Sequence, residues 1–146
     1  MNNTAHLYLP NYENLISFLK ATDFSAPISI ESYAIKVLKH ATFIAIIDNG
    51  LILGLSIVYL NRKEKDFAYL TYISIDKRYR GLGLGKILLS QTLEEAKIRG
   101  FETLKLEVKK SNHIATHLYR SLGFRDVLIM DNSSYMELHL YDNRQN

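Results

Sequence analysis

The sequence predicts one mixed α/β domain, residues 1–146, built on a mixed but mostly antiparallel sheet of about seven strands with helices on both faces. Two observations support this fold class. Asn49-Gly50 lies between two apolar runs, which is the strongest short signal for a β-hairpin. Strand-like runs dominate the middle of the chain, and two later amphipathic segments stand between strands. The expected order is β-α-α-β-β-β-α-β-α-β-β.

The first half of the chain should form a short strand, two helices and a hairpin. Pro10 ends the first strand, and both helical segments show apolar residues at helical spacing. Gly54 marks a possible β-bulge in the second hairpin strand. The expected ranges are 7–9, 11–23, 29–39, 42–47 and 51–60.

The second half alternates strands with two helices. Arg99-Gly100 is a typical helix C-terminus, Ser111 is a suitable N-cap, and Gly123 ends the last helix. The expected strands are 67–75, 103–108, 124–130 and 135–140, and the expected helices are 87–99 and 111–121. The first of these helices should bury one face, formed by Gly85, Leu88, Leu89, Thr92, Leu93 and Ala96.

Composition excludes several classes of site. The sequence has no cysteine, which excludes disulfides, thiolate metal sites and cysteine nucleophiles. The net charge of +3 is too small to indicate nucleic-acid binding. No apolar run reaches the roughly 20 residues of a membrane helix, and the N-terminus lacks the apolar core of a signal peptide. We therefore expect a cytoplasmic protein without membrane or nucleic-acid partners.

A glycine-rich loop between a strand and a helix is the first motif with chemical meaning. Such a loop directs backbone N–H groups and the positive end of a helix dipole at an anion. A Walker A loop is excluded, because Arg80 and Ile87 stand where it needs glycine and Ser or Thr. The dinucleotide spacing G-x-G-x-x-G is also absent. The pattern present is Arg-x-x-Gly-x-Gly, in Arg80-Gly81-Leu82-Gly83-Leu84-Gly85-Lys86.

The second motif follows the next strand. A helix there should bury Ile114, Ala115, Leu118 and Leu122, with Tyr119 at the edge of that face. Asn112 lies in the first turn, where its amide either faces the same cleft as the glycine loop or only caps the helix. The full pattern is Asn112-x-x-Ala115-x-x-Leu118-Tyr119-x-x-x-Gly123-Phe124.

With these two motifs in this order, the chain resembles the GNAT superfamily of acetyl-CoA-dependent N-acetyltransferases over about residues 69–124. The resemblance implies a GNAT-like fold, acetyl-CoA as co-substrate, no metal, and direct acetyl transfer to an amine acceptor through a ternary complex. A homodimer is a further possibility. The absence of cysteine agrees with direct transfer, because no thiol can carry the acetyl group.

The resemblance also implies a role for each motif. The loop would hold the CoA pyrophosphate through backbone N–H groups, and the strand before it would border the pantetheine arm. A backbone N–H near Ile73 or Ser74 would polarise the thioester carbonyl, and Tyr119 would donate a proton to the departing thiolate. The residues implied to contact acetyl-CoA are Ile73, Ser74, Ile75, Arg80, Gly81, Leu82, Gly83, Leu84, Gly85, Lys86, Asn112 and Tyr119.

The acceptor side leaves alternatives open. Many members of the family place a glutamate on the strand before the loop, but residues 67–75 contain no carboxylate. Proton removal then falls to water held by Tyr72 or Ser74, or to a residue such as Glu107 or Glu31. Candidate acceptor contacts are Glu31, Tyr33, Tyr72 and Tyr135.

Three functions compete. A small-molecule primary amine is the preferred acceptor, and a protein N-terminal α-amine or lysine is the alternative. A CoA-binding or sensory domain without catalysis is the third. His113 and His117 have the spacing of a helical metal pair, but Ile114 replaces the expected glutamate, so a solvated pair is the better interpretation.

Overall fold

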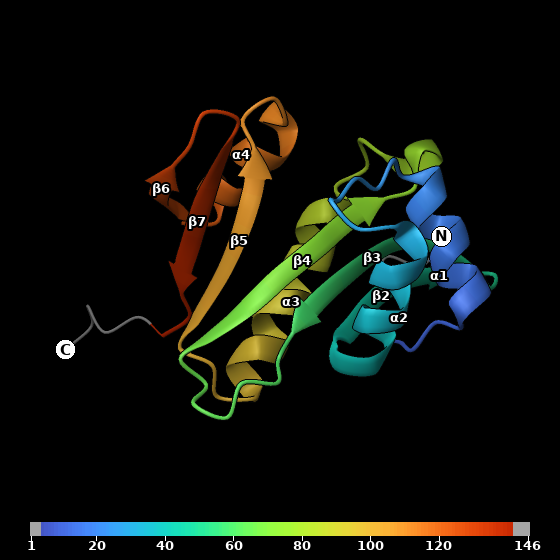
Figure 1. The fold of residues 1–146 in the computed structure, drawn as a ribbon, viewed down its shortest axis with the longest axis horizontal. Coiled ribbons are helices and arrows are strands. Elements are labelled where there is room, and N and C mark those ends of the chain that lie inside the picture. Colours follow the sequence, from blue (N-terminus) through green and yellow to red (C-terminus); the bar gives the residue numbers. More distant parts are fainter. Residues whose placement is uncertain (1–3, 142–146) are drawn as a thin grey trace.

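The computed structural model describes residues 4–141 and confirms the predicted order of elements (Figure 1). The strands are β1 Ala5–Leu7, β2 Thr42–Asp48, β3 Leu51–Tyr59, β4 Phe67–Ile75, β5 Thr103–Lys109, β6 Arg125–Ile129 and β7 Ser133–His139. The helices are α1 Tyr12–Ala21, α2 Ile30–His40, α3 Leu84–Ile98 and α4 His113–Ser121. A short 3₁₀ helix, η1 Lys77–Tyr79, was not predicted.

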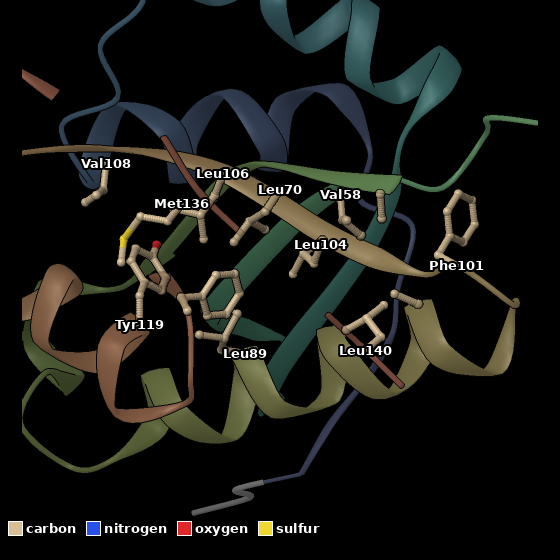
Figure 2. Close-up of a cluster of buried hydrophobic side chains, with 13 residues drawn as sticks. Val58, Leu70, Leu89, Phe101, Leu104, Leu106, Val108, Tyr119, Met136 and Leu140 are labelled. Carbon is tan, nitrogen blue, oxygen red and sulfur yellow. The ribbon is translucent and has the colours of Figure 1, made fainter. Parts of the chain in front are cut away.

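The described strands form one seven-stranded sheet in the order β1-β2-β3-β4-β5-β7-β6. Neighbouring strands are antiparallel except β4 and β5, which run parallel, so the predicted mixed sheet is confirmed. Helices α1 and α2 cover β2 and β3 on one face, where Leu15 and Val37 are fully buried. Helices α3 and α4 cover the other face, and the core between them and the sheet includes Leu89 and Leu104 (Figure 2).

The β2–β3 hairpin forms as the Asn-Gly pair predicts. Asn49 and Gly50 have φ angles of 51° and 77°, the left-handed values that a type I′ turn requires. The bulge predicted near Gly54 is present one residue earlier, since Leu53 is the extra residue between the pairs Ile46↔Gly54 and Ile47↔Ile52. No helix within residues 4–141 has the length and apolarity needed to cross a membrane.

Three local predictions need correction. The first strand is Ala5–Leu7 and not 7–9, although the Tyr8 N–H still donates to the Phe43 carbonyl at 3.0 Å. The N-cap of α4 is Asn112 and not Ser111, because Asn112 Oδ1 accepts the Ala115 N–H at 3.1 Å. Ile114, which was predicted to be buried, is 86% accessible. The core contacts of α4 come from Ala115, Leu118, Tyr119 and Leu122.

A buried hydrogen bond joins α3 to the sheet. The Thr92 hydroxyl donates to Ser56 Oγ on β3 at 2.8 Å and lies 2.9 Å from the Leu88 carbonyl. Both Thr92 and Ser56 are fully buried. Since a buried hydroxyl without a partner is unfavourable, the two side chains depend on each other.

We expect Thr92→Val to lower the free energy of unfolding by about 1–3 kcal/mol, because it leaves the Ser56 hydroxyl buried without its partner. Ser56→Ala serves as the matched single variant. Adding it to Thr92→Val should recover part of the loss, so that the double variant is more stable than the sum of the singles. Urea unfolding of the four proteins measures the coupling, and strictly additive losses would contradict it.

Candidate functional site

The sheet is split between β4 and β5. These two strands pair only from Phe67↔Thr103 to Leu70↔Leu106. Thr71 is an extra residue in β4, between the pairs Val58↔Leu70 and Ile57↔Tyr72. A bulge of this kind bends its strand, and β4 turns away from β5 immediately after it (Figure 1). The later part of β4 thus has an edge that β5 does not occupy.

Tyr33 holds the bulge from behind. Its hydroxyl lies 3.1 Å from Thr71 Oγ1, and its ring packs against Phe24, with the ring centroids 4.4 Å apart. Burial raises the pKa of Tyr33 well above its usual value, so the phenol stays neutral. The structure therefore places Tyr33, a candidate acceptor contact, in the core behind the cleft, where it does not line the cavity.

A cavity of 180 Å³ occupies the split. It brings together residues from β4, from β5, and from the N-cap and last turn of α4. The lining residues are Leu70, Thr71, Tyr72, Ile73, Leu106, Glu107, Val108, Lys109, Asn112 and Tyr119. Of the predicted site residues, the cavity thus unites Tyr72, Ile73, Asn112 and Tyr119. A larger hollow of 310 Å³ lies at the β1 edge and contains none of them.

Tyr119 is the acid candidate in this cavity. The structure moves it from the predicted edge of α4 into the core, where its ring lies 5.6 Å from the Phe124 ring. Its hydroxyl points from α4 toward the sheet (Figure 2). Burial raises the pKa of Tyr119 to about 12, so the side chain keeps its proton at neutral pH. A protonated phenol beside the cavity can donate a proton to a group that develops negative charge there.

Glu107 is a carboxylate that lines the cavity, although the strand before the loop has none. It lies on β5, on the far side of the split from β4, and it lines the cavity. The Ser133 hydroxyl donates to Glu107 Oε2 at 2.7 Å and fixes the carboxylate. The sequence named Glu107 only as one possibility. Its alternation with the buried Leu106 and Val108 indicated a side chain on the opposite face, but nothing local showed that this face opens onto the split.

The remaining acceptor candidates differ in position. Tyr72 lines the cavity, and its hydroxyl lies 2.6 Å from Thr22 Oγ1 at the end of α1. Tyr135 is the cross-strand neighbour of Glu107 on β7, beside the cavity. Glu31 is exposed in the first turn of α2 and does not line the cavity. The structure thus brings Tyr72 and Tyr135, but not Glu31, to the region of Glu107.

The glycine loop has a left-handed backbone at two of its three glycines. Gly81 and Gly83 both have φ angles of 80°, and a Cβ on either would meet nothing within 4 Å. Glycine is needed there for the left-handed backbone and not for lack of room. Gly83 precedes α3 without a side-chain cap, and the first turn of α3 has no acidic residue. The N-terminal N–H groups of α3 are therefore available to an anion.

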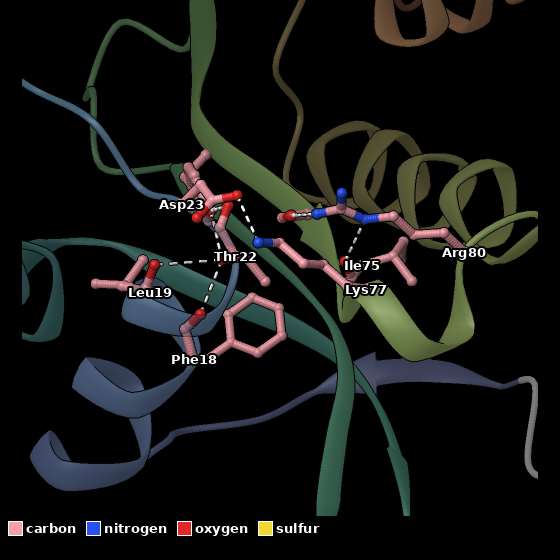
Figure 3. Close-up of polar contacts among 9 residues, drawn as sticks. Phe18, Leu19, Thr22, Asp23, Ile75, Lys77 and Arg80 are labelled. Carbon is pink, nitrogen blue, oxygen red and sulfur yellow. Dashed lines mark hydrogen bonds and ion pairs between the residues drawn. The ribbon is translucent and has the colours of Figure 1, made fainter.

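Side chains around the loop fix it to the rest of the site (Figure 3). Arg80 Nε donates to the Ile75 carbonyl at 2.9 Å, and its Nη2 donates to Ser74 Oγ at 3.3 Å. Lys77 forms an ion pair of 2.7 Å with Asp23 at the end of α1. The guanidinium of Arg80 thus ties the loop to the end of β4.

The other residues of the loop are either packed against the core or exposed to solvent. Leu84, the first residue of α3, is buried against β2 and β3, and a Cβ on Gly85 would stand 3.6 Å from Leu118 of α4. Leu82 and Lys86 are exposed. Their contribution to an anion site is therefore the backbone, together with the charge of Lys86.

Asn112 both caps α4 and lines the cavity, so the two interpretations of this residue are compatible. His113 and His117 are exposed, as the solvated interpretation predicted. In the part of the chain that the structure describes, no three metal-ligating side chains come together.

Known proteins share both the sequence pattern and the fold of this chain. A family model described as "Acetyltransferase (GNAT) family" matches residues 5–124. The chain is 35% identical over 135 residues to the [ribosomal protein bS18]-alanine N-acetyltransferase of Escherichia coli K12, covering 82% of this chain and 86% of that one. The structure of the S18-alanine enzyme from E. coli superposes with a TM-score of 0.79 at 24% identity, over 98% of both chains. PaiA N-acetyltransferase from Thermoplasma acidophilum, in complex with coenzyme A, superposes with a TM-score of 0.70 at 15% identity, over 93% of this chain and 99% of that one.

The two roles of Asn112, as the N-cap of α4 and as a lining residue of the cavity, can be separated by substitution. Asn112→Ala should lower the free energy of unfolding by about 1 kcal/mol, because α4 loses its N-cap. Asn112→Ser keeps a capping oxygen and should keep most of the stability, while it shortens the group that faces the cavity. Thermal unfolding measures the cap. If Asn112→Ser destabilises the protein as much as Asn112→Ala, the side chain is not acting as a simple cap.

Proposed function

The chain belongs to the acetyltransferase (GNAT) family and is an N-acetyltransferase, and we propose that it transfers the acetyl group of acetyl-CoA to the N-terminal α-amine of a protein. The observation that carries this proposal is the 35% identity, across 82% of the chain, to an enzyme named for an alanine of ribosomal protein bS18. An alanine within a polypeptide has a free amine only when it is the first residue. The small-molecule amine preferred from the sequence is not confirmed, and the protein alternative becomes the better supported one.

For the donor, we assign the pyrophosphate of CoA to the glycine loop. The uncapped N-terminus of α3 and the left-handed Gly81 and Gly83 provide the N–H groups and the close approach that a diphosphate needs. PaiA, which shares the fold, is described in complex with coenzyme A. The pantetheine arm would then run along the free edge of β4, past Ile73 and Ile75 to Asn112, and pair with it as an added strand.

For the chemistry, the two sides of the cavity supply complementary groups. Glu107 accepts a proton from the acceptor amine, directly or through water, and the neutral nitrogen attacks the thioester carbonyl. The backbone N–H of Ile73 or Ser74 stabilises the oxyanion that forms on the carbonyl oxygen. When the C–S bond breaks, Tyr119 donates its proton to the sulfur, and CoA leaves as the thiol. The nitrogen loses its second proton to water as the amide forms, and water re-protonates the Tyr119 phenolate.

Two related interpretations follow from this assignment. The non-catalytic alternative rested only on the missing carboxylate of the strand before the loop, and Glu107 in the cavity removes that support. We also propose a cytoplasmic location. This location suits a protein acceptor such as ribosomal protein bS18, after which the relative is named.

We expect Glu107→Gln and Tyr119→Phe each to lower kcat/KM by about 10²–10⁴, because each removes one proton-transfer group and keeps the shape of the cavity. The assay is free-thiol release from acetyl-CoA with a peptide that begins with alanine. The same peptide with a blocked α-amine is the control. Turnover of polyamines but not of the free peptide would favour the small-molecule acceptor, and unchanged rates in both variants would refute the roles of these residues.

We expect Gly83→Ala to weaken CoA binding by at least tenfold, because a left-handed backbone costs an L-residue about 1–2 kcal/mol and the loop will relax away from its binding geometry. Leu82→Ala is the matched control, since it shortens an exposed side chain in the same loop and leaves the backbone free to keep its shape. Isothermal titration with CoA measures both. Equal affinities for Gly83→Ala and wild type would place the pyrophosphate elsewhere.

A further inference from the structure

Strand β6 is an edge strand whose second half is apolar and exposed. It lies at the end of the sheet, paired only with β7 among the described strands. Its second half continues into Met130 as four consecutive apolar residues, which are between 48% and 64% exposed, namely Val127, Leu128, Ile129 and Met130. A continuous apolar run is typical of a strand that is covered on both faces, as β3 is here.

The opposite edge of the sheet shows how this protein limits edge pairing. Strand β1 has only three residues, and Pro10 follows shortly after it. On β6, an extra residue at Val127 bends the strand, but no charge or proline interrupts the four apolar residues. Exposed apolar edges of this kind pair readily with another strand.

Charges flank the apolar run on both sides. Arg125 precedes it and Asp131 follows it, and neither forms an ion pair within residues 4–141. The neighbouring Asp126, in contrast, pairs with Arg120 at 2.8 Å. The segment 125–131 therefore presents an unpaired cation at one end and an unpaired anion at the other.

We propose that β6 pairs antiparallel with β6 of a second copy of the chain, with the two-fold axis at Leu128. In this register Leu128 faces its own counterpart, and Arg125 lies opposite Asp131 of the partner subunit. The two-fold symmetry repeats this ion pair, so the segment is complementary to itself in both charge and apolarity. This match favours a second copy over an unrelated protein.

The dimer leaves the active site open. In the sheet order, β7 and β5 lie between β6 and the split beside β4. The cavity and the glycine loop therefore take no part in the proposed contact, and Glu107 is separated from Leu128 by Tyr135 of β7. One continuous sheet would run through both copies. Catalysis and dimerisation thus use different parts of the same sheet.

Sedimentation velocity over a concentration series tests the contact. The wild-type protein should sediment as a dimer, and Leu128→Lys should raise the dimer dissociation constant at least tenfold, because two ammonium groups then meet at the axis. Ile98→Lys is the matched control, since Ile98 is also exposed but lies at the end of α3. A wild-type monomer at all concentrations, or equal losses in both variants, would overturn the proposal.

A charge exchange tests the register. Arg125→Asp and Asp131→Arg should each raise the dissociation constant at least tenfold, since each places like charges opposite one another. The double variant restores opposite charges and should return to within about threefold of the wild type. Circular dichroism confirms that each variant is folded. Failure of the double variant to recover the dimer would refute this register.

Discussion

The site depends on one extra residue in one strand. If Thr71 were not inserted into β4, the parallel pairing with β5 would continue past Leu70 and Leu106, and no cavity would separate the strands. Both strand edges are left without their expected partner, which is tolerable only where a ligand or water can satisfy the backbone. The Tyr33 hydroxyl and the ring of Phe24 hold the bulge from the α2 side, so the opening is built into the core.

Short-range contacts around this opening fix the glycine loop, the cavity and the end of α1 relative to one another. Arg80 ties the glycine loop to the end of β4, and Lys77 joins the adjoining η1 to Asp23 at the end of α1. Tyr72, which lines the cavity, contacts Thr22 at the same end of α1. The buried pair of Thr92 and Ser56 anchors the helix that the loop begins. The glycine loop, the cavity and the end of α1 are therefore all held in position by contacts with β4.

Much of this could be predicted from the sequence, because it depends on local chemistry. The Asn49-Gly50 turn, the left-handed glycines of the loop and the buried face of α3 each follow from a few neighbouring residues. The bulge at Thr71 could not be predicted, since it is defined only by the register of β4 against β3. For the same reason the sequence did not select Glu107, whose position beside the cavity requires the split. On α4, the buried face contains Tyr119 and not Ile114, because the position of the helix on the sheet and not its own periodicity decides which edge of the apolar face is covered.

The two phenols of the cavity, the buried Tyr119 and the partly buried Tyr72, have a consequence for chemical selectivity. Burial raises the pKa of both Tyr72 and Tyr119, so neither changes its charge near neutrality. The fraction of the acceptor amine that is neutral then strongly affects the rate of acetyl transfer. With ordinary pKa values of about 7.9 for an α-amine and about 10.4 for lysine, the neutral, reactive fraction of the α-amine is roughly 300 times larger at pH 7. A protein surface that carries many lysines would compete poorly with one chain terminus, even before the shape of the cleft discriminates between them.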